Sequence, residues 1–488
     1  MFVGEYVDVL IVGAGLSGIG AAYHLQDKCS DRSYAIVEAR ANLGGTWDLF
    51  RYPGIRSDSD MYTLGYSFRP WEEGKAIADG PAILRYIRDT ARDYGIERKI
   101  RYGLRVERAA WSSADRLWRV ELTRSESGER VRIQCGFLFT CAGYYRYDQG
   151  YTPDLPGLEA FSGPVVHPQA WPEDFECAGK EVLVVGSGAT AVTLVPSLAD
   201  RAALVTMLQR SPTYIVAVPA RDRVALALRE LLSPKLAYRL TRWKNVALGM
   251  FFFQLARRFP GLARRRMLEG VRQALGPDYP VEPDFSPRYN PWDQRVCLTP
   301  DGDFFEAMKQ GRVAVRTGEI DRITRDRVRL VDGGELKADV LVLATGLQLQ
   351  LMGGMVLEID GAELRPAESF MYKGMMLSDV PNFAVSLGYT NASWTLKSDL
   401  TGEYVCRLLR HMAAHGYDCC TPRVRDSSLQ PEPWTTLSAG YVQRSIAAFP
   451  KQGSRAPWRI YNNYLLDLIA LRYGKLEDGC MEFSAGSD

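Results

Sequence analysis

Histidine is scarce in this sequence, which has only His24, His167, His411 and His415 among its 488 residues. We assign none of them to a metal-binding motif, so the sequence predicts no metal site and argues against a zinc enzyme. The nine cysteines include no Cys-x-x-Cys pair, which argues against a dithiol disulfide reductase. Unpatterned cysteines and a first segment without the character of a signal peptide predict a cytoplasmic protein.

A strong net charge is also missing, and no apolar stretch is long enough to cross a membrane. Sixty Lys and Arg residues stand against 58 Asp and Glu residues, and the net charge of +2 argues against nucleic acid as a partner. The apolar run 246–256 is well short of the ~20 residues that a spanning helix needs. With 46% hydrophobic and 24% charged residues, the chain has the composition of a globular protein. Its length predicts about three domains.

A glycine pattern near the start of the chain indicates a dinucleotide site. The apolar run 6–12 leads into Gly-Ala-Gly-Leu-Ser-Gly, a helical pattern follows, and the next apolar run ends at Glu38. In such a strand–turn–helix unit, Gly13 permits the tight turn, Gly15 lets a pyrophosphate approach the backbone and Gly18 lets helix and strand pack closely. The helix N-terminus faces the phosphates, and Glu38 accepts a hydrogen bond from a ribose hydroxyl. The alternative is a purely structural glycine turn.

The same arrangement recurs later, with a different ending. The apolar run 180–185 precedes Gly-Ser-Gly-Ala-Thr-Ala at 186–191, and the next run, 204–208, ends in Gln209-Arg210-Ser211. An arginine and a serine at this place suit a 2′-phosphate, so the pattern favours NADP over NAD. The alternative is that Arg210 is an ordinary surface charge.

Two further apolar runs that end in glycine turns predict how these units are connected. Residues 137–143 lead out of the first unit, and residues 340–346 lead back into it. The predicted fold class is α/β, with two Rossmann-like dinucleotide-binding domains, the second nested in the first, and a helical insert. The predicted domains are FAD-binding 1–145 and 338–488, NADPH-binding 146–218 (with a linker) and 291–337, and the helical insert 219–290.

The linker between the two units carries a family signature. It matches Phe-x-Gly-x-x-x-His-x-x-x-Trp-Pro at every fixed position, with Phe161, Gly163, His167 and Trp171. This resembles the fingerprint of Baeyer–Villiger monooxygenases, and the resemblance extends over essentially the whole chain. RYPGIRSDSDMYTLGYSFRPW, YNPWDQR and GYTNASWTLK are most similar to the mycobacterial ethionamide-activating branch. Flavin oxygenases restricted to heteroatoms usually end the fingerprint in Tyr or Phe, not Trp.

The resemblance implies an FAD-dependent, NADPH-consuming monooxygenase that inserts one oxygen atom of O2 into ketones to give esters or lactones. It also implies sulfoxidation of thioethers or thioamides, so the expected partners are O2 and a small ketone or sulfide. Two alternatives stay open: a heteroatom-only flavin N/S-monooxygenase, and a membrane-associated NADPH/FAD redox sensor. Formation of an ester from a ketone separates the first hypothesis from both. The sequence assigns no oligomeric state.

The resemblance further assigns roles to individual residues. Arg295 matches the catalytic arginine, a fixed cation beside an anionic flavin peroxide, and Asp58 is expected to orient it. The alternative is an ion pair that only joins two domains. His167 is expected to couple domain motion to cofactor binding rather than to act as a base, and Trp171 to form a hinge or cofactor wall. The expected cofactor-binding residues are Gly13, Gly15, Ser17, Gly18, Glu38, Thr46, Trp47, Arg56, Asp58, Val106, Gly186, Ser187, Gly188, Ala189, Thr190, Ala191, Gln209, Arg210 and Ser211.

One position departs from the family pattern. Many relatives carry a lysine immediately before the catalytic arginine, where it contacts the 2′-phosphate, and this chain has Gln294. A neutral amide lacks one charge-assisted bond, so the preference for NADPH should rest mainly on Arg210.

The segment 219–290 has a charge of its own. It holds fourteen Lys or Arg residues against six Asp or Glu residues, a net of +8, and includes the apolar run 246–256. We expect a helical lid that packs on the NADPH-binding domain and lines the substrate entrance. The alternative is a basic amphipathic surface over 243–266 that lies on anionic lipid, which would make the protein peripheral on a membrane.

Overall fold

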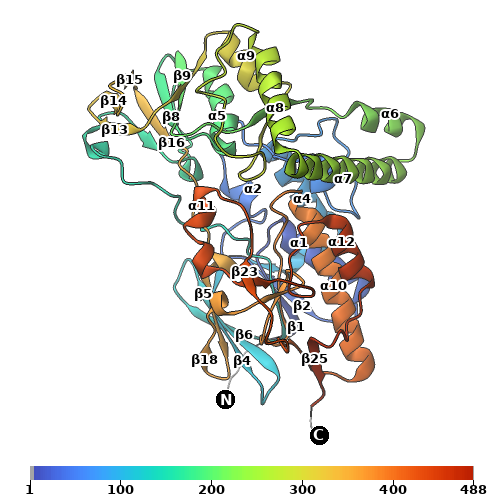
Figure 1. The fold of residues 1–488 in the computed structure, drawn as a ribbon. Helices are drawn as coiled ribbons and strands as arrows, with labels where there is room; N and C mark the ends of the chain where they lie inside the picture. Colours follow the sequence, from blue (N-terminus) through green and yellow to red (C-terminus); the bar gives the residue numbers. More distant parts are fainter. Residues whose placement is uncertain (1–4, 487–488) are drawn as a thin grey trace.

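A large mixed sheet forms the lower part of the molecule in Figure 1. The computed structural model describes residues 5–486. The strand order is β18-β17-β4-β5-β6-β1-β2-β3, and β21 also pairs with β6. The second half of β1, Val9 to Val12, is apolar and buried, and the strand runs parallel to both β2 and β6. The strands are β1 (Glu5–Val12), β2 (Tyr34–Val37), β3 (Ile100–Arg101), β4 (Leu104–Ser112), β5 (Leu117–Arg124), β6 (Arg130–Thr140), β17 (Val356–Ile359), β18 (Ala362–Glu363) and β21 (Phe383–Val385).

Two helices that are far apart in the sequence pack together beside this sheet. They are α1 (Leu16–Lys28) and α10 (Trp394–His415), and Figure 1 shows them adjacent. Gly402 of α10 allows the close approach, since a side-chain carbon there would come within 2.8 Å of the His24 ring on α1. The first part of the chain and its C-terminal part therefore form one core.

A second, fully parallel sheet forms the upper part of the molecule (Figure 1). Its order is β12-β9-β8-β16-β7, with helices α5 (Ala189–Ala199) and α9 (Asp303–Lys309) packed beside it. The apolar run 340–346 was expected to lead back into the first domain from residue 338 onward. Instead β16 pairs with β8 and β7, because a run that is buried on both faces completes the parallel sheet. The strands are β7 (Val165–Val166), β8 (Glu181–Val185), β9 (Leu204–Gln209), β12 (Val313–Thr317) and β16 (Val340–Leu343).

The insert is helical, as expected, but it packs differently from the prediction. Its helices are α6 (Arg223–Leu231), α7 (Pro234–Arg258) and α8 (Pro260–Leu275), framed by the paired strands β10 (Ile215–Val218) and β11 (Cys297–Pro300). We call the part of the molecule built on the large mixed sheet the first region and the part built on the parallel sheet the second region. The helix α8 packs on the second region, whereas α7 packs on the first. Arg242, only 7% exposed, donates hydrogen bonds to the backbone oxygens of Tyr62 and Gly65. A buried guanidinium needs such acceptors, and α3 supplies them.

The remaining helices and strands, apart from the 14-residue helix α4, are short. Within residues 5–486, no helix combines the length and hydropathy needed to cross a membrane. These elements are α2 (Thr46–Leu49), α3 (Met61–Leu64), α4 (Gly80–Asp93), β13 (Ile320–Ile323), β14 (Arg327–Leu330), β15 (Glu335–Lys337), β19 (Met371–Tyr372), β20 (Met376–Leu377), β22 (Cys419–Pro422), β23 (Pro431–Pro433), α11 (Gly440–Gln443), β24 (Lys451–Gly453), α12 (Tyr464–Leu468), a π-helical turn (Ile469–Tyr473) and β25 (Met481–Ser484).

Candidate cofactor and active site

A cavity of about 950 Å³ lies between the two regions. Residues at the carboxyl ends of β1 and β2 line it on one side, and residues at the ends of β8 and β9 line it on the other. In parallel α/β sheets this is the edge where ligands bind, because the loops there leave a crevice and the helix N-termini point into it. Both glycine turns therefore open into one cavity.

The glycines of the first turn serve two different needs. Gly13 has a φ of 103°, and a side-chain carbon there would lie 2.8 Å from the Cys141 carbonyl oxygen. At Gly18 such a carbon would overlap the carbonyl oxygen of Gly13. At Gly15 its nearest neighbour would be the Gly45 Cα at 3.5 Å, an ordinary contact. The fold thus requires Gly13 and Gly18, whereas Gly15 leaves a space that a ligand can use.

The acidic residue at the end of β2 is held in place by the turn. Glu38 is 7% exposed, and its two carboxylate oxygens accept from the backbone N–H groups of Ala14 at 2.8 Å and Arg40 at 3.0 Å. Burial raises the pKa of the Glu38 carboxyl, although these hydrogen bonds act in the opposite direction. The carboxylate is part of the cavity wall, where it can accept from a ribose hydroxyl.

Other predicted residues of the first region also line this part of the cavity. Thr46 Oγ1 lies 3.2 Å from the Tyr147 hydroxyl, and Ser17 Oγ accepts from Trp394 Nε1 at 2.7 Å. Trp47, Arg56, Asp58 and Val106 line it as well. Gly15 is the N-cap of α1 and provides no side-chain cap, so the first backbone N–H groups of the helix face the cavity. An open glycine, a helix N-terminus and a fixed carboxylate fit the pyrophosphate and ribose of FAD.

The second turn repeats the backbone geometry in a more open setting. Gly186 has a φ of 133°, and a side-chain carbon there would overlap the Ala344 carbonyl oxygen. A side-chain carbon at Gly188 would meet no atom within 4 Å. Ser187 Oγ donates to the Ser211 carbonyl oxygen at 3.0 Å, and Arg210 is exposed on the cavity wall. The cavity wall here also includes Ala189, Thr190 and Ser211.

Three residues predicted to bind a nucleotide, Gly18, Ala191 and Gln209, do not line the cavity. Gln209 is 1% exposed, and its Nε2 donates to the Asp284 carbonyl oxygen at 2.6 Å and to Thr317 Oγ1 at 3.0 Å. Successive side chains of a strand point to opposite faces, so Gln209 points inward where Arg210 points outward. Ala191 is 0% exposed and lies on the buried side of α5, which packs in the core. Gly18 serves the close packing of the first turn instead, since a side-chain carbon there would overlap the Gly13 carbonyl oxygen. The predictions that these three residues contact a nucleotide are therefore corrected.

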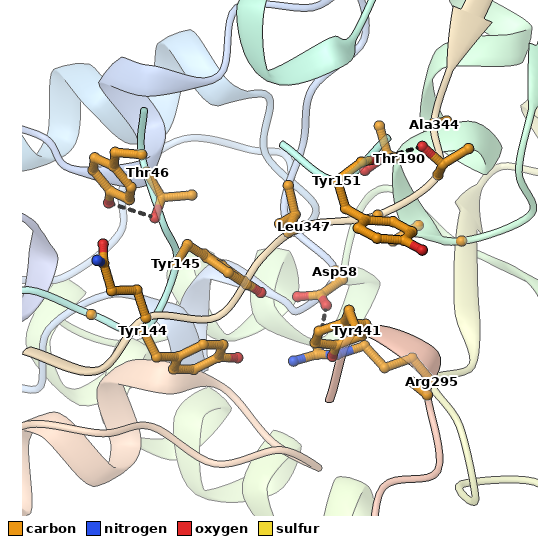
Figure 2. A pocket seen from close by; sticks show the side chains of 18 of the residues that line it. Thr46, Asp58, Tyr144, Tyr145, Tyr151, Thr190, Arg295, Ala344, Leu347 and Tyr441 are labelled. Carbon is orange, nitrogen blue, oxygen red and sulfur yellow. Dashed lines mark hydrogen bonds and ion pairs between the residues drawn. The ribbon is translucent and has the colours of Figure 1, made fainter. Parts of the chain in front are cut away.

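A charged pair joins the two regions inside the cavity. Arg295 Nη1 donates to Asp58 Oδ2 at 2.7 Å, and Figure 2 shows this bond beside Tyr144, Tyr145 and Tyr441. The two side chains are 31% and 48% exposed, which means that they face the open cavity. Desolvation alone would lower the pKa of Arg295, but the oxygens of Tyr441 and Asp58 outweigh it and hold this pKa well above its usual range. Arg295 therefore remains a cation at every accessible pH.

Arg56 has a partner that the sequence did not predict. It borders the cavity, yet its guanidinium forms an ion pair with Asp303, at the start of α9 in the second region. A second hydrogen bond, Nη2 to Oδ1, measures 3.3 Å. Arg56 thus contributes a second link between the regions, because both ends of its planar guanidinium are taken up by one carboxylate.

The four fingerprint residues lie outside the cavity. The cavity wall, as far as residues 5–486 form it, includes none of Phe161, Gly163, His167 and Trp171. His167 Nδ1 accepts from the Gln169 N–H at 3.2 Å, and burial lowers the pKa of its imidazole. Trp171 packs against Phe175 with 4.5 Å between ring centroids, so it forms no wall of this cavity. The motif therefore belongs to the connection between the regions, with Gln169 Nε2 bonded to the backbone of 146–147.

Sequence reasoning missed the aromatic wall around Arg295. Tyr144 and Tyr145 directly follow the predicted glycine turn at 143, which was a usable signal. Tyr441 is on α11, 146 positions after Arg295, and nothing in its local pattern indicated the site.

Comparisons with known proteins agree with this architecture. Residues 11–73 match the family model of the NAD(P)-binding Rossmann-like domain, and residues 70–226 match the flavin-binding monooxygenase-like model. The chain is 51% identical to the FAD-containing monooxygenase EthA of Mycobacterium tuberculosis, over 98% of both chains. It is 48% identical to the putative FAD-containing monooxygenase MymA of the same organism, over 99% of this chain and 98% of that one.

Solved structures share the fold at low identity. A steroid monooxygenase bound to NADP superposes with a TM-score of 0.76 at 22% identity, over 99% of this chain and 100% of the other. A polycyclic ketone monooxygenase from Thermothelomyces thermophila gives 0.78 at 17% identity, over 99% and 90%. The predicted fold class, with two dinucleotide-binding regions, is confirmed. So is the predicted relationship: the chain belongs to the family of FAD-containing flavin monooxygenases that includes mycobacterial EthA and MymA.

Proposed function

We propose that the protein is a Baeyer–Villiger monooxygenase that converts a ketone, O2, NADPH and a proton into an ester or lactone, water and NADP⁺. The observation that carries the proposal is the Arg295–Asp58 pair, which faces a cavity shared by both glycine turns. When bound, FAD accepts hydride from NADPH and activates O2. We further propose sulfoxidation of thioethers or thioamides in the same cavity.

Arg295 provides a positive charge where negative charge develops on the reacting oxygen. A guanidinium does not release its proton at physiological pH, so it stabilises this charge without acting as an acid. Asp58 holds one edge of the guanidinium plane and directs the other toward the cavity. Because the two residues come from different regions, their geometry depends on how the regions are packed, and the site is complete only in the assembled fold.

The two nucleotide sites follow from the two turns. FAD would be held by the first turn, with Gly15 beside the pyrophosphate and Glu38 on the ribose. NADPH would be held by the second turn, with Arg210 on the 2′-phosphate and Ser211 beside it. The proposed domains are those predicted from the sequence, except that β16 belongs to the NADPH-binding sheet.

Product analysis tests the activity. The purified protein is incubated with NADPH, O2 and a panel of linear, cyclic and aryl ketones, together with one methyl aryl sulfide, and products are identified by mass. Esters or lactones from ketones are expected. Sulfoxide without ester would establish a heteroatom-only oxygenase, and NADPH-dependent flavin reduction without any oxygenated product would establish the redox-sensor alternative.

We also propose that α7 and α8 contact anionic membranes. Leu248, Phe251 and Phe252 are 45%, 60% and 59% exposed and share one face of α7 at i, i+3 and i+4. Exposed Phe259 lies between the helices, and exposed Arg258, Arg265 and Arg266 are nearby, together with Arg257, which pairs with Asp293. Apolar rings flanked by arginines are typical of helices that lie in a lipid interface.

Vesicle sedimentation tests this contact. The protein should bind vesicles that contain phosphatidylglycerol more strongly than vesicles of phosphatidylcholine alone, and F251S/F252S should abolish the binding. Val331, 67% exposed in the β14–β15 hairpin, provides the matched control V331S, which should bind as the unmodified protein does. Equal binding by F251S/F252S would contradict the proposal.

A further inference from the structure

The end of α10 that lies away from the cavity presents two histidines beside a glutamate. His411 and His415 are four positions apart, and therefore on the same side of the helix. Glu477 follows the π-helical turn and reaches the same place, with its Oε1 3.0 Å from His411 Nε2. The sequence prediction of no metal site did not take this spacing into account, and Glu477 could not have been associated with it from the sequence.

The three side chains are already close to a coordination geometry. One nitrogen or oxygen atom of each lies within 4.8 Å of the other two, and the two imidazole centroids are 4.2 Å apart. Around Zn²⁺, ligand atoms at ~2.0–2.2 Å from the ion lie ~3–3.5 Å from one another. His411 Nε2 and Glu477 Oε1 have this separation, and a small displacement of the His415 ring, whose ligand atom is already within 4.8 Å of both, closes the triangle.

Hydrogen bonds leave the required lone pairs in position. His415 Nδ1 lies 2.9 Å from the His411 carbonyl oxygen, which can only accept, so Nδ1 carries the proton and Nε2 presents its lone pair. Metal-bound histidines usually donate their other N–H to a carbonyl in this way. His411 Nε2 donates to Glu477 in the metal-free protein, and a cation can take the place of that proton between the same two atoms.

Neighbouring aromatic rings hold both imidazoles. Tyr417 stacks on His415 with 5.7 Å between centroids and an interplanar angle of 8°. Phe483 meets His411 edge-on at 5.0 Å. Little side-chain freedom is therefore lost when a ligand binds, which favours affinity.

We propose that His411, His415 and Glu477 bind a transition-metal dication such as Zn²⁺, with water in the remaining position. Two imidazole nitrogens and one carboxylate suit Zn²⁺, Ni²⁺ or Cu²⁺, whereas Mg²⁺ and Ca²⁺ prefer all-oxygen sites. The ion joins α10 to the segment 474–484, in which Asp478 already pairs with Lys373 at 3.0 Å. The 22-residue helix places the site ~30 Å from Trp394 at the cavity, so the ion is structural and not catalytic.

Titration of the flavin-loaded, tag-free protein tests the proposal. Calorimetry with Zn²⁺ should give one ion per chain. Co²⁺ should produce the visible absorption bands that are typical of a low coordination number. Zn²⁺ should raise the melting temperature, because the three ligands come together only in the folded state. H415A and E477Q should each weaken Zn²⁺ binding at least tenfold and remove the rise in melting temperature, with unchanged flavin content.

Glu482 provides the matched control. It is a carboxylate on the same C-terminal segment that pairs with Arg423 instead of a histidine, so E482Q should bind Zn²⁺ as the unmodified protein does. The proposal is overturned if the unmodified protein binds no Zn²⁺, Ni²⁺ or Cu²⁺ at about 1 mM, or if H415A and E477Q bind Zn²⁺ with the same stoichiometry and affinity as it does.

Discussion

The two glycine turns have the same backbone geometry but different surroundings. Gly13 and Gly186 both have positive φ, and Gly15 and Gly188 both leave room for a ligand. The first turn is covered by the loop that carries Gly45, and its acidic residue, Glu38, is 7% exposed. At the second turn Gly188 and Arg210 are exposed to the cavity, and within residues 5–486 Arg210 has no hydrogen-bond or ion-pair partner.

This difference corresponds to two ways of using a nucleotide. A covered site with preformed hydrogen bonds holds its ligand for a long time, since release requires the covering loop to move. An open site with an unpaired cation binds an anion quickly and also releases it. A flavin that stays bound and a nicotinamide nucleotide that exchanges in each cycle would use these two sites respectively.

The largest expected effect comes from the pair that lies between the two sites. R295A removes one fixed charge and should slow ester formation by 10²–10³, about 2.7–4 kcal/mol. Both glycine turns are untouched, so anaerobic bleaching of the flavin by NADPH should remain within a few-fold of the unmodified rate. R295K should restore little of the ester formation, because an ammonium cannot reproduce the planar contact with Asp58. Normal ester formation by R295A would show that the Arg295–Asp58 pair only links the two regions and has no catalytic role.

Arg210 and Gln209 test which face of β9 recognises the nucleotide. R210A should raise KM for NADPH tenfold to a hundredfold, about 1.5–3 kcal/mol, and leave KM for NADH nearly unchanged. Q209A should lower the melting temperature instead, since it leaves Asp284 and Thr317 without their buried donor. If R210A raises both KM values equally, Arg210 supports the fold and not the 2′-phosphate.

A matched pair of alanines compares the two turns directly. G15A places a methyl group where the protein itself has room but a pyrophosphate does not, so flavin affinity should fall by about 1–3 kcal/mol, the usual range for overpacking. G188A should keep its flavin and lose affinity for NADPH only. Flavin absorbance of the purified variants reports their FAD content, and KM for NADPH reports the affinity of the second site. The two assignments would be exchanged if G188A were the colourless variant.

The smallest expected effect is that FAD binding at the first turn depends on pH, whereas NADPH binding at the second turn does not. Because the pKa of Glu38 is raised above the ordinary 4.5, this carboxylate takes up its proton at a higher pH than other glutamates do. A protonated Glu38 has lost one acceptor, so FAD binding should weaken a few-fold as pH falls from neutrality toward that pKa. NADPH binding, which relies on an arginine, should not follow the same curve. E38Q should flatten the pH profile for FAD, and a wild-type profile that is already flat would remove Glu38 from the site.

The local patterns of the sequence were sufficient for much of the fold and for parts of the site. The glycine turns, the strands on either side of them and Glu38 could be predicted because strand, turn and helix are set by residues within about thirty positions of one another. The Arg295–Asp58 contact came from a family resemblance, since 237 positions separate the two residues. The strand 340–343 was placed in the wrong sheet because a buried apolar run carries no information about which sheet it completes.

The sequence by itself determined two nucleotide-binding turns, the order of the regions and the family of the protein, because these depend on short-range backbone chemistry. Only the tertiary structure decided that Gln209 points away from the cavity, that Arg56 pairs with Asp303 and that α7 packs on the first region. Only it brought Tyr441 to Arg295 and Glu477 to His411. Side chains such as these meet because sheets and helices bury their apolar faces against each other, and the polar contacts that result join residues that no local pattern relates.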